Sequence, residues 1–274
     1  QAIVLFAGVF ANFLLAWLLF SIGFMSGLPT SVGSEPIGYK LSDVNLMVVS
    51  VLAKSPAEVA GLKSGDKIVT IASGNDYVSN VNPDTLKSFI LSHASKTIDI
   101  GYVRGKEKIF GLVKVVPIID KSTQQPLIGI SMDMIGTAKL PVFTALKEGM
   151  LLTLFVTKGT IVGLYTLIAD SLRGQGSFAS VTGPVGMVGI VGDAYQFGFV
   201  YLLSFSALIS VNLAIINLFP FPALDGGRLF FLLIEKIKGS RLNPKFANTA
   251  NMIGFGILIL LMVVVTFHDI VKLF

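Results

Sequence analysis

Three long apolar stretches dominate the pattern of hydrophobic and polar positions along the chain. They cover residues 1–28, 195–227 and 249–274. Together they hold only three charged side chains, which are Asp225, Asp269 and Lys272. Each stretch exceeds the roughly 20 residues that a helix needs to cross the hydrocarbon core of a membrane. We therefore predict a membrane-spanning helix in each of them.

A fourth apolar stretch, residues 139–180, is interrupted by Lys147, Glu148 and Lys158. A lysine at the centre of a membrane-spanning helix costs about 3 kcal/mol on insertion scales. We therefore expect a membrane-associated amphipathic helical segment that lies in the interface. A membrane-spanning helix is the alternative, because the stretch is long and mostly apolar.

The pattern between the first and the fourth stretch is that of a soluble domain. Residues 29–44 are rich in Gly, Pro and Ser and are predicted to form a linker. Residues 45–135 contain short β-branched runs bounded by turn residues, which predict strands at 46–52 and 67–73.

Two helices are predicted within the same domain. Ser55 followed by Pro56 is typical of a helix start, and Gly61 of a helix end. Residues 85–93 carry apolar side chains at helical spacing. A small β-rich domain with two helices results.

The composition supports a membrane protein. Hydrophobic residues make up 53% of the chain and charged residues 14%, whereas an ordinary soluble domain is about one-quarter charged. The predicted fold class is a mostly α-helical polytopic membrane protein with an inserted small β-rich domain (α+β). The net charge of +5 does not indicate a nucleic-acid partner, because membrane proteins carry Lys and Arg on cytoplasmic loops. The absence of cysteine excludes disulfides and thiolate metal sites.

Basic residues set the predicted topology. The segment 228–248 holds Arg228, Lys236, Lys238, Arg241 and Lys245. The positive-inside rule predicts that this loop or helix is cytoplasmic. The β-rich domain then lies outside if residues 139–180 rest on the membrane surface, and inside if they span it. We favour the outside placement because of the lysine at the centre of that segment.

The segment NLFPFPALDGG, Asn217–Gly227, places the carboxylate of Asp225 in a proline-rich break at the end of a predicted span. Irregular backbone at membrane depth is tolerated where it lines a water-filled cavity, and an ionisable group there is a functional candidate. The alternative is a surface cap, in which Asp225 begins the next helix and pairs with Arg228.

This segment resembles the NxxPxPxLDGG signature of the site-2 protease family, the zinc-dependent intramembrane metalloproteases, and is especially similar to the bacterial RseP-type members. FAGVFANFLLA resembles the family's AGPxxN helix, with Val9 in place of its proline, and TGPVG resembles the element before the LDG helix. VVSVLAKSPAEVAGLKSGDKIVTI looks like a bacterial-type PDZ domain, which we place at residues 45–135. The resemblance extends over essentially the whole chain.

The resemblance implies a role for each residue of the motif. Asp225 would be the carboxylate ligand of a catalytic Zn²⁺, completed by two histidines and a general base from an HExxH helix. The residues implied to contact substrate are Asn212, Asn217, Pro220 and Pro222. The residues implied to support the site are Gly226, Gly227 and Asn12. The alternative role for the asparagines is hydrogen bonding between helices.

The sequence departs from the family because it contains no HExxH. Neither His93 nor His268 has a histidine four residues away, so both are expected to be structural or exposed. In the family the HExxH helix precedes the AGPxxN helix. We therefore expect a chain that is truncated upstream, holds no catalytic residue of its own and is inactive alone.

The expected function is that of an intramembrane zinc endopeptidase in a bacterial inner membrane. Its substrates would be transmembrane segments of single-span proteins, such as anti-sigma factors, or remnant signal peptides. The PDZ domain would lie on the periplasmic side, as a size filter or a docking module for an extended peptide, or as a plain spacer. The alternatives are a non-catalytic membrane PDZ adaptor and a transporter, since broken helices also mark transport sites.

Overall fold

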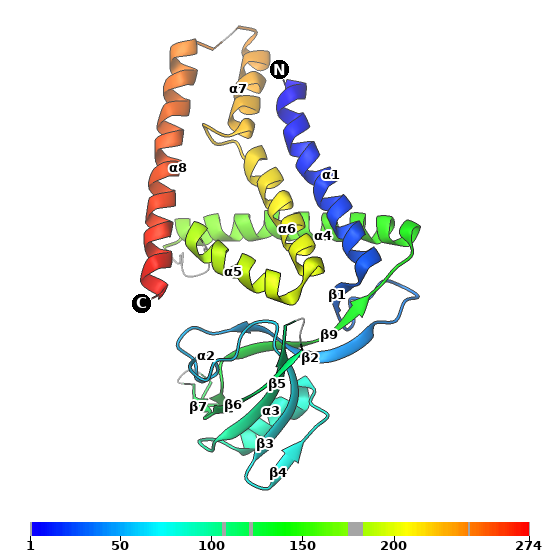
Figure 1. Cartoon of the computed structure of the whole chain (residues 1–274). Coiled ribbons are helices and arrows are strands. Elements are labelled where there is room, and N and C mark those ends of the chain that lie inside the picture. The colour runs from blue at the N-terminus through cyan, green and yellow to red at the C-terminus, as the bar shows by residue number, and fades with distance from the viewer. Residues whose placement is uncertain (1, 106–107, 121–122, 175–182, 241, 274) are drawn as a thin grey trace. The chain divides into compact units, whose positions relative to one another are not determined.

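The computed structural model describes residues 2–105, 108–120, 123–174, 183–240 and 242–273 (Figure 1). The chain divides into two compact units. The helical unit comprises Gln1–Phe24, Pro141–Gly192 and Leu202–Phe274, and the sheet unit comprises Met25–Leu140 and Asp193–Tyr201. The sheet unit is thus inserted between the first helix and the remaining helices along the chain.

Helices account for most of the chain outside the sheet domain. They are α1 (Ala2–Ser26), α4 (Val142–Leu172), α5 (Pro184–Phe197), α6 (Phe199–Leu218), α7 (Asp225–Lys238) and α8 (Pro244–Leu273). Four of the helices in the described residues, α1, α4, α6 and α8, are long and apolar enough to cross a membrane. Three of these, α1, α6 and α8, overlap the three stretches that were predicted to span, and α4 lies within the ambiguous stretch.

Helix α1 packs against α6 through small and aromatic side chains. Ala16 and Phe20 of α1 form a buried cluster with Ala207 and Val211 of α6. Small residues at such contacts let helix backbones approach closely. In a membrane, where no hydrophobic effect drives helices together, the resulting van der Waals packing helps to hold them.

Helix α4 also packs against α1, and it runs crosswise to α1, α6 and α8 (Figure 1). The indole N–H of Trp17 donates to the Leu146 carbonyl at 2.8 Å. Gly149 of α4 lies directly against Ser21 of α1: a Cβ on Gly149 would be only 2.9 Å from the Ser21 nitrogen. The crosswise course bears on whether this helix spans a membrane.

The sheet unit is built on an antiparallel sheet with the strand order β1-β9-β2-β3-β5-β6, and β4 pairs with β3. The strands are β1 (Leu28–Ser31), β2 (Ser42–Val51), β3 (Lys67–Ser73), β4 (Asp76–Val78), β5 (Ile98–Arg104), β6 (Ile109–Val115) and β9 (Ile130–Ala138). Two short strands, β7 (Ile118–Ile119) and β8 (Pro126–Leu127), form a separate pair.

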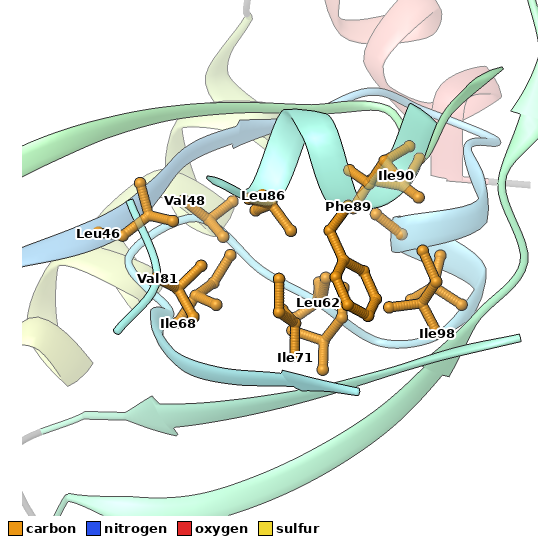
Figure 2. Close-up of a cluster of buried hydrophobic side chains, with 14 residues drawn as sticks. Leu46, Val48, Leu62, Ile68, Ile71, Val81, Leu86, Phe89, Ile90 and Ile98 are labelled. Atoms are coloured by element: carbon orange, nitrogen blue, oxygen red, sulfur yellow. The ribbon is translucent and has the colours of Figure 1, made fainter. Parts of the chain in front are cut away.

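The two helices predicted in this domain begin where their caps indicate. In α2 (Pro56–Val59) the Ser55 hydroxyl accepts a hydrogen bond from the Glu58 amide at 3.3 Å. In α3 (Pro83–Ser92) Asn82 and Thr85 form a reciprocal capping box. Side chains of α3 and of the facing strands make one hydrophobic core (Figure 2).

Two buried polar side chains in the domain, Asp66 and His93, are paired with partners. Asp66, whose side chain is fully buried, is bound by the Arg104 guanidinium through two contacts at 2.5 and 2.6 Å. His93 is buried; its Nδ1 lies 2.9 Å from the Phe89 carbonyl and its Nε2 lies 3.0 Å from Asp76. His93 is therefore structural, which is one of the two roles expected for it.

The expected fold class, a polytopic α-helical membrane protein with an inserted β-rich domain, is confirmed. The segment 29–44, expected as a linker, differs in that it contains most of β1. Pro29 and Thr30 pair with Thr137 and Gly136 of β9. A short strand of this kind depends on a partner more than 100 residues away along the chain, so local composition does not indicate it.

Candidate functional site

The polar motif of the helical unit lies where α6 ends and α7 begins. Between Leu218 and Asp225 the chain follows no helix. The prolines at 220 and 222 lack an N–H, so they break the regular helical hydrogen bonding. Ala223 has a φ of +81°, an uncommon conformation for a residue with a Cβ that clusters at functional sites.

Gly226 and Gly227 sit against the backbone of this break. A Cβ on Gly226 would collide with the carbonyl oxygens of Leu218 and Phe219. A Cβ on Gly227 would lie 2.7 Å from the carbonyl carbon of Phe221 and would collide with its oxygen. The first turn of α7 is therefore pressed onto the broken chain, and only glycine fits at both positions.

Asp225 is the first residue of α7 and is half-buried. The residue before it, Leu224, offers no side-chain cap, so first-turn amides of α7 lack a capping side chain. A negative charge is favoured at this end of a helix dipole. Asp225 begins the helix, as the surface-cap interpretation expects, but within the described residues no hydrogen bond or ion pair joins it to Arg228 or to another side chain.

The three predicted asparagines differ in their surroundings. Asn212 of α6 accepts a hydrogen bond from the Thr160 hydroxyl of α4 at 2.9 Å, which is the interhelical role considered for it. Asn217 is half-buried near the end of α6 and has no hydrogen-bond partner among the described residues. Asn12 lies half-buried in α1, likewise without a partner in the described part of the chain.

An apolar cavity of about 750 Å³ reaches this region from between α1, α4 and α6. Its walls include Phe10 of α1, Ile161 and Tyr165 of α4, and Leu218 and Pro220 at the end of α6. Its size is in the range of protein binding pockets, which are mostly apolar. Pro220 of the motif lies in the wall of this cavity, whereas Asp225 does not.

The carboxylate of Asp225 fits one position of a zinc site, because zinc accepts Asp oxygen together with His nitrogen. The described residues contain no group of three or more His, Cys, Asp and Glu side chains that could hold a metal. His268 lies in the same helix as Asn251, which contacts the break, but 17 residues further on. That spacing corresponds to about 26 Å along a helix axis, and His93 belongs to the other unit.

Two residues that sequence reasoning missed lie on α8. Asn251 accepts a hydrogen bond from the Ala223 amide at 3.1 Å. Gly254 is buried, and a Cβ there would lie 2.8 Å from the carbonyl carbon of Pro222. The available signal was a polar side chain and two glycines in the otherwise apolar segment NMIGFG.

A second candidate site is the open edge of β9 in the sheet unit. The Gly129 carbonyl accepts from Leu52 beside β2 at 2.8 Å, and the Met134 carbonyl accepts from Val32 on the other side at 2.9 Å. Backbone groups alternate in direction along a strand, so those of Ile130 and Met132 point away from β2. The pairing of β1 with β9 covers only Ile135–Ala138, which leaves these groups free of strand partners within the described residues. Helix α3 lies next to β9.

Comparison with known families decides the relationship. The family described as "Peptidase family M50" matches residues 1–261. The chain belongs to this family. The resemblance to the site-2 proteases, of which the motif was the first indication, is thereby confirmed.

Two RasP proteins illustrate the relationship. The zinc metalloprotease RasP of Geobacillus kaustophilus is 32% identical over 276 residues, which is all of this chain and 59% of that protein. The regulator of sigma-W protease RasP of Bacillus subtilis is 32% identical over 98% of this chain and 58% of that protein. The chain thus spans about 60% of the length of these relatives.

A putative zinc metalloprotease of Clostridium acetobutylicum is 32% identical over 98% of this chain and 71% of that protein. Among solved structures, the PDZ domain of the SdrC-like protein of Listeria monocytogenes is 25% identical, covers 34% of this chain and 93% of that domain, and gives a TM-score of 0.28.

Proposed function

We propose that this chain provides the membrane scaffold and one metal ligand of a zinc-dependent intramembrane endopeptidase. The observation that supports this most directly is the half-buried Asp225 carboxylate, which has no partner among the described residues. The two residues that follow it, Gly226 and Gly227, are at positions where only glycine fits. An ionisable side chain of this kind near a membrane helix is a functional candidate. The relatives named as zinc metalloproteases point to the same chemistry.

Asp225 would hold one coordination position, and residues outside these 274 would supply the nitrogen ligands and the general base. With zinc held there, the site would supply a bound water of pKa about 7 and Lewis-acid polarisation of a carbonyl. The chain's own contribution is to fix the carboxylate through its two glycines and to surround it with apolar helices. On this proposal the chain has no catalytic residue of its own and is inactive alone.

The substrate would be an apolar segment of a single-span membrane protein. The cavity between α1, α4 and α6 is apolar and ends at Pro220, so it suits a transmembrane segment that enters sideways. Asn217, whose amide can both donate and accept, stands at the end of α6 to receive an unwound backbone. Anti-sigma factors and remnant signal peptides are substrates of the right class, and one relative is named a regulator of sigma-W protease.

The chain is a multi-pass membrane protein, and we propose an inner-membrane location with a cytoplasmic loop at residues 228–248. Because α4 runs crosswise to α1, α6 and α8, it would lie along the membrane if those three helices cross it. With the loop at residues 228–248 in the cytoplasm, a chain of this topology would carry its PDZ domain on the periplasmic side. There the open edge of β9 would accept an extended peptide as an added strand.

The test is Asp225→Asn in the full-length protein, meaning this chain together with the segment that carries the other ligands. Cleavage of a single-span reporter in cells should be lost while the protein level stays the same. Retained full activity would refute the metal role. If the unmutated full-length protein is expressed but neither cleaves the reporter nor carries zinc on purification, the non-catalytic adaptor is favoured.

A further inference from the structure

Both sides of a single peptide group in the break are in contact with α8. This is the group that joins Pro222 to Ala223. Its N–H donates to the Asn251 side chain at 3.1 Å, and its carbonyl carbon faces Gly254, where a Cβ would come within 2.8 Å. The two α8 residues lie three positions apart, and residues with this spacing share one helix face.

This peptide group lies at the centre of a tight turn, and its own N–H and carbonyl face away from the bond that closes the turn. Ala223 has a positive φ, which persists in a residue with a Cβ only where the surroundings over-determine it. The prolines at 220 and 222 contribute no N–H, and the turn around this peptide is closed internally by one bond, from the Leu224 amide to the Phe221 carbonyl at 3.1 Å. That bond uses neither the Ala223 N–H nor the Pro222 carbonyl. Asn251 is half-buried in a helix whose neighbouring side chains are mostly apolar, and an amide oxygen is the acceptor that the free N–H requires.

The position of this peptide group decides where Asp225 stands. Only Leu224, the N-cap of α7, separates Ala223 from Asp225. Gly226 and Gly227 are in turn pressed onto the carbonyls of the break, so a shift of the Pro222–Ala223 peptide moves the first turn of α7 with it. Outer residues that orient a metal ligand typically contribute 10–100-fold in metal affinity.

We propose that Asn251 and Gly254 of α8 are positioning residues that lock the Pro222–Ala223 peptide and thereby set the Asp225 carboxylate. This inference rests on the proposed function for its metal consequence, but its structural part holds without a metal. It also assigns α8, which carries no residue of the protease signature, a defined role in the site.

The first experiment measures amide hydrogen exchange of the 274-residue chain in lipid nanodiscs. Asn251→Leu removes the acceptor, and Gly254→Ala forces the peptide to move. Both should raise exchange of the amides between Phe219 and Gly227 by at least about tenfold, while α6 and the sheet domain keep their protection. Asn251→Asp retains an acceptor oxygen and should keep the protection of these amides at the level of the unmutated chain.

Matched controls lie on the same helix. Asn248 is exposed, and a Cβ on Gly256 would meet nothing within 4 Å. Asn248→Leu and Gly256→Ala should therefore leave exchange of the break unchanged. Equal effects of target and control variants, or faster exchange throughout the helical unit, would overturn the positioning role and leave α8 as general packing.

The second experiment measures zinc loss from the full-length protein to a chelator. Asn251→Leu and Gly254→Ala should release zinc about 10–100-fold faster, whereas the two control variants should not. If the target variants lose protection in the break but the unmutated full-length protein carries no zinc, the proposed function is refuted and the structural lock is kept. Unchanged zinc release and unchanged exchange in a zinc-bearing protein would refute the lock and keep the function.

Discussion

Replacing Gly227 by alanine tests whether the break is as tightly packed as its geometry indicates. The new Cβ would lie 2.7 Å from the carbonyl carbon of Phe221 and 3.1 Å from the Cα of Pro222. Ordinary contacts begin near 3.4 Å, so the Phe221 carbonyl carbon must move by about 0.7 Å, and the carbonyl oxygen, which lies closer still, must move further. All of the atoms that the Cβ would meet belong to backbone, which a side-chain rotation cannot relieve.

Two consequences of different size follow from that displacement. Overpacking of this kind costs about 1–3 kcal/mol of stability, which a membrane protein with intact apolar helices survives. A misplacement of about 1 Å at a reacting centre costs on the order of 100-fold in rate, so cleavage should fall by about 10- to 100-fold. Activity should therefore drop far more than the amount of folded protein.

The assay is reporter cleavage in cells by the full-length protein, normalised to protein level. Gly163→Ala in α4 is the control, because a Cβ there would meet nothing within 4 Å. Gly163→Ala should cleave at the normal rate. Normal cleavage by Gly227→Ala would refute the claim that the glycine contacts set the position of Asp225.

Three further predictions concern the rest of the chain. Asp66→Asn replaces the fully buried carboxylate that binds the partly exposed Arg104 guanidinium by a neutral amide, and should lower the free energy of unfolding of the sheet domain by about 1–3 kcal/mol, measured by urea unfolding; a loss under about 0.5 kcal/mol would contradict this. Met132→Pro removes an N–H on the open edge of β9 and a side chain that packs against the core, so it should abolish binding of an extended peptide in a fluorescence titration and lower the stability of a domain that still folds, whereas Ser131→Pro, on the β2 side, should unfold the domain. Thr160→Val removes the hydrogen bond to Asn212 and should cost about 0.6 kcal/mol in detergent unfolding, with a loss above 2 kcal/mol arguing for a larger role.

Local signals in the sequence predicted much of the fold. Strand β3 occupies the predicted range, Lys67–Ser73, because its β-branched run is bounded by turn residues on both sides. Ser55 begins α2 as its type and place before a proline predict. The apolar stretches became helices because their length and lack of charge permit little else in a membrane.

Contacts between distant parts of the chain were beyond sequence reasoning. Asn251 and Gly254 meet the break because α8 returns to it, and no local pattern marks their partner. Gly149 of α4 fits closely against Ser21 of α1, a contact that hydropathy does not encode. Thr182 of the TGPVG element and Arg241 of the basic loop lie outside the described residues.

The Asp225 carboxylate as a metal ligand is the central claim, and a ligand exchange tests it most directly. The 274 residues contain no cysteine, so Asp225→Cys introduces a single thiol into this part of the full-length protein. After replacement of zinc by Co²⁺, the account predicts a thiolate-to-cobalt charge-transfer absorption that is absent from the unmutated protein. Cobalt bound with the same spectrum in both proteins would show that residue 225 does not touch the metal.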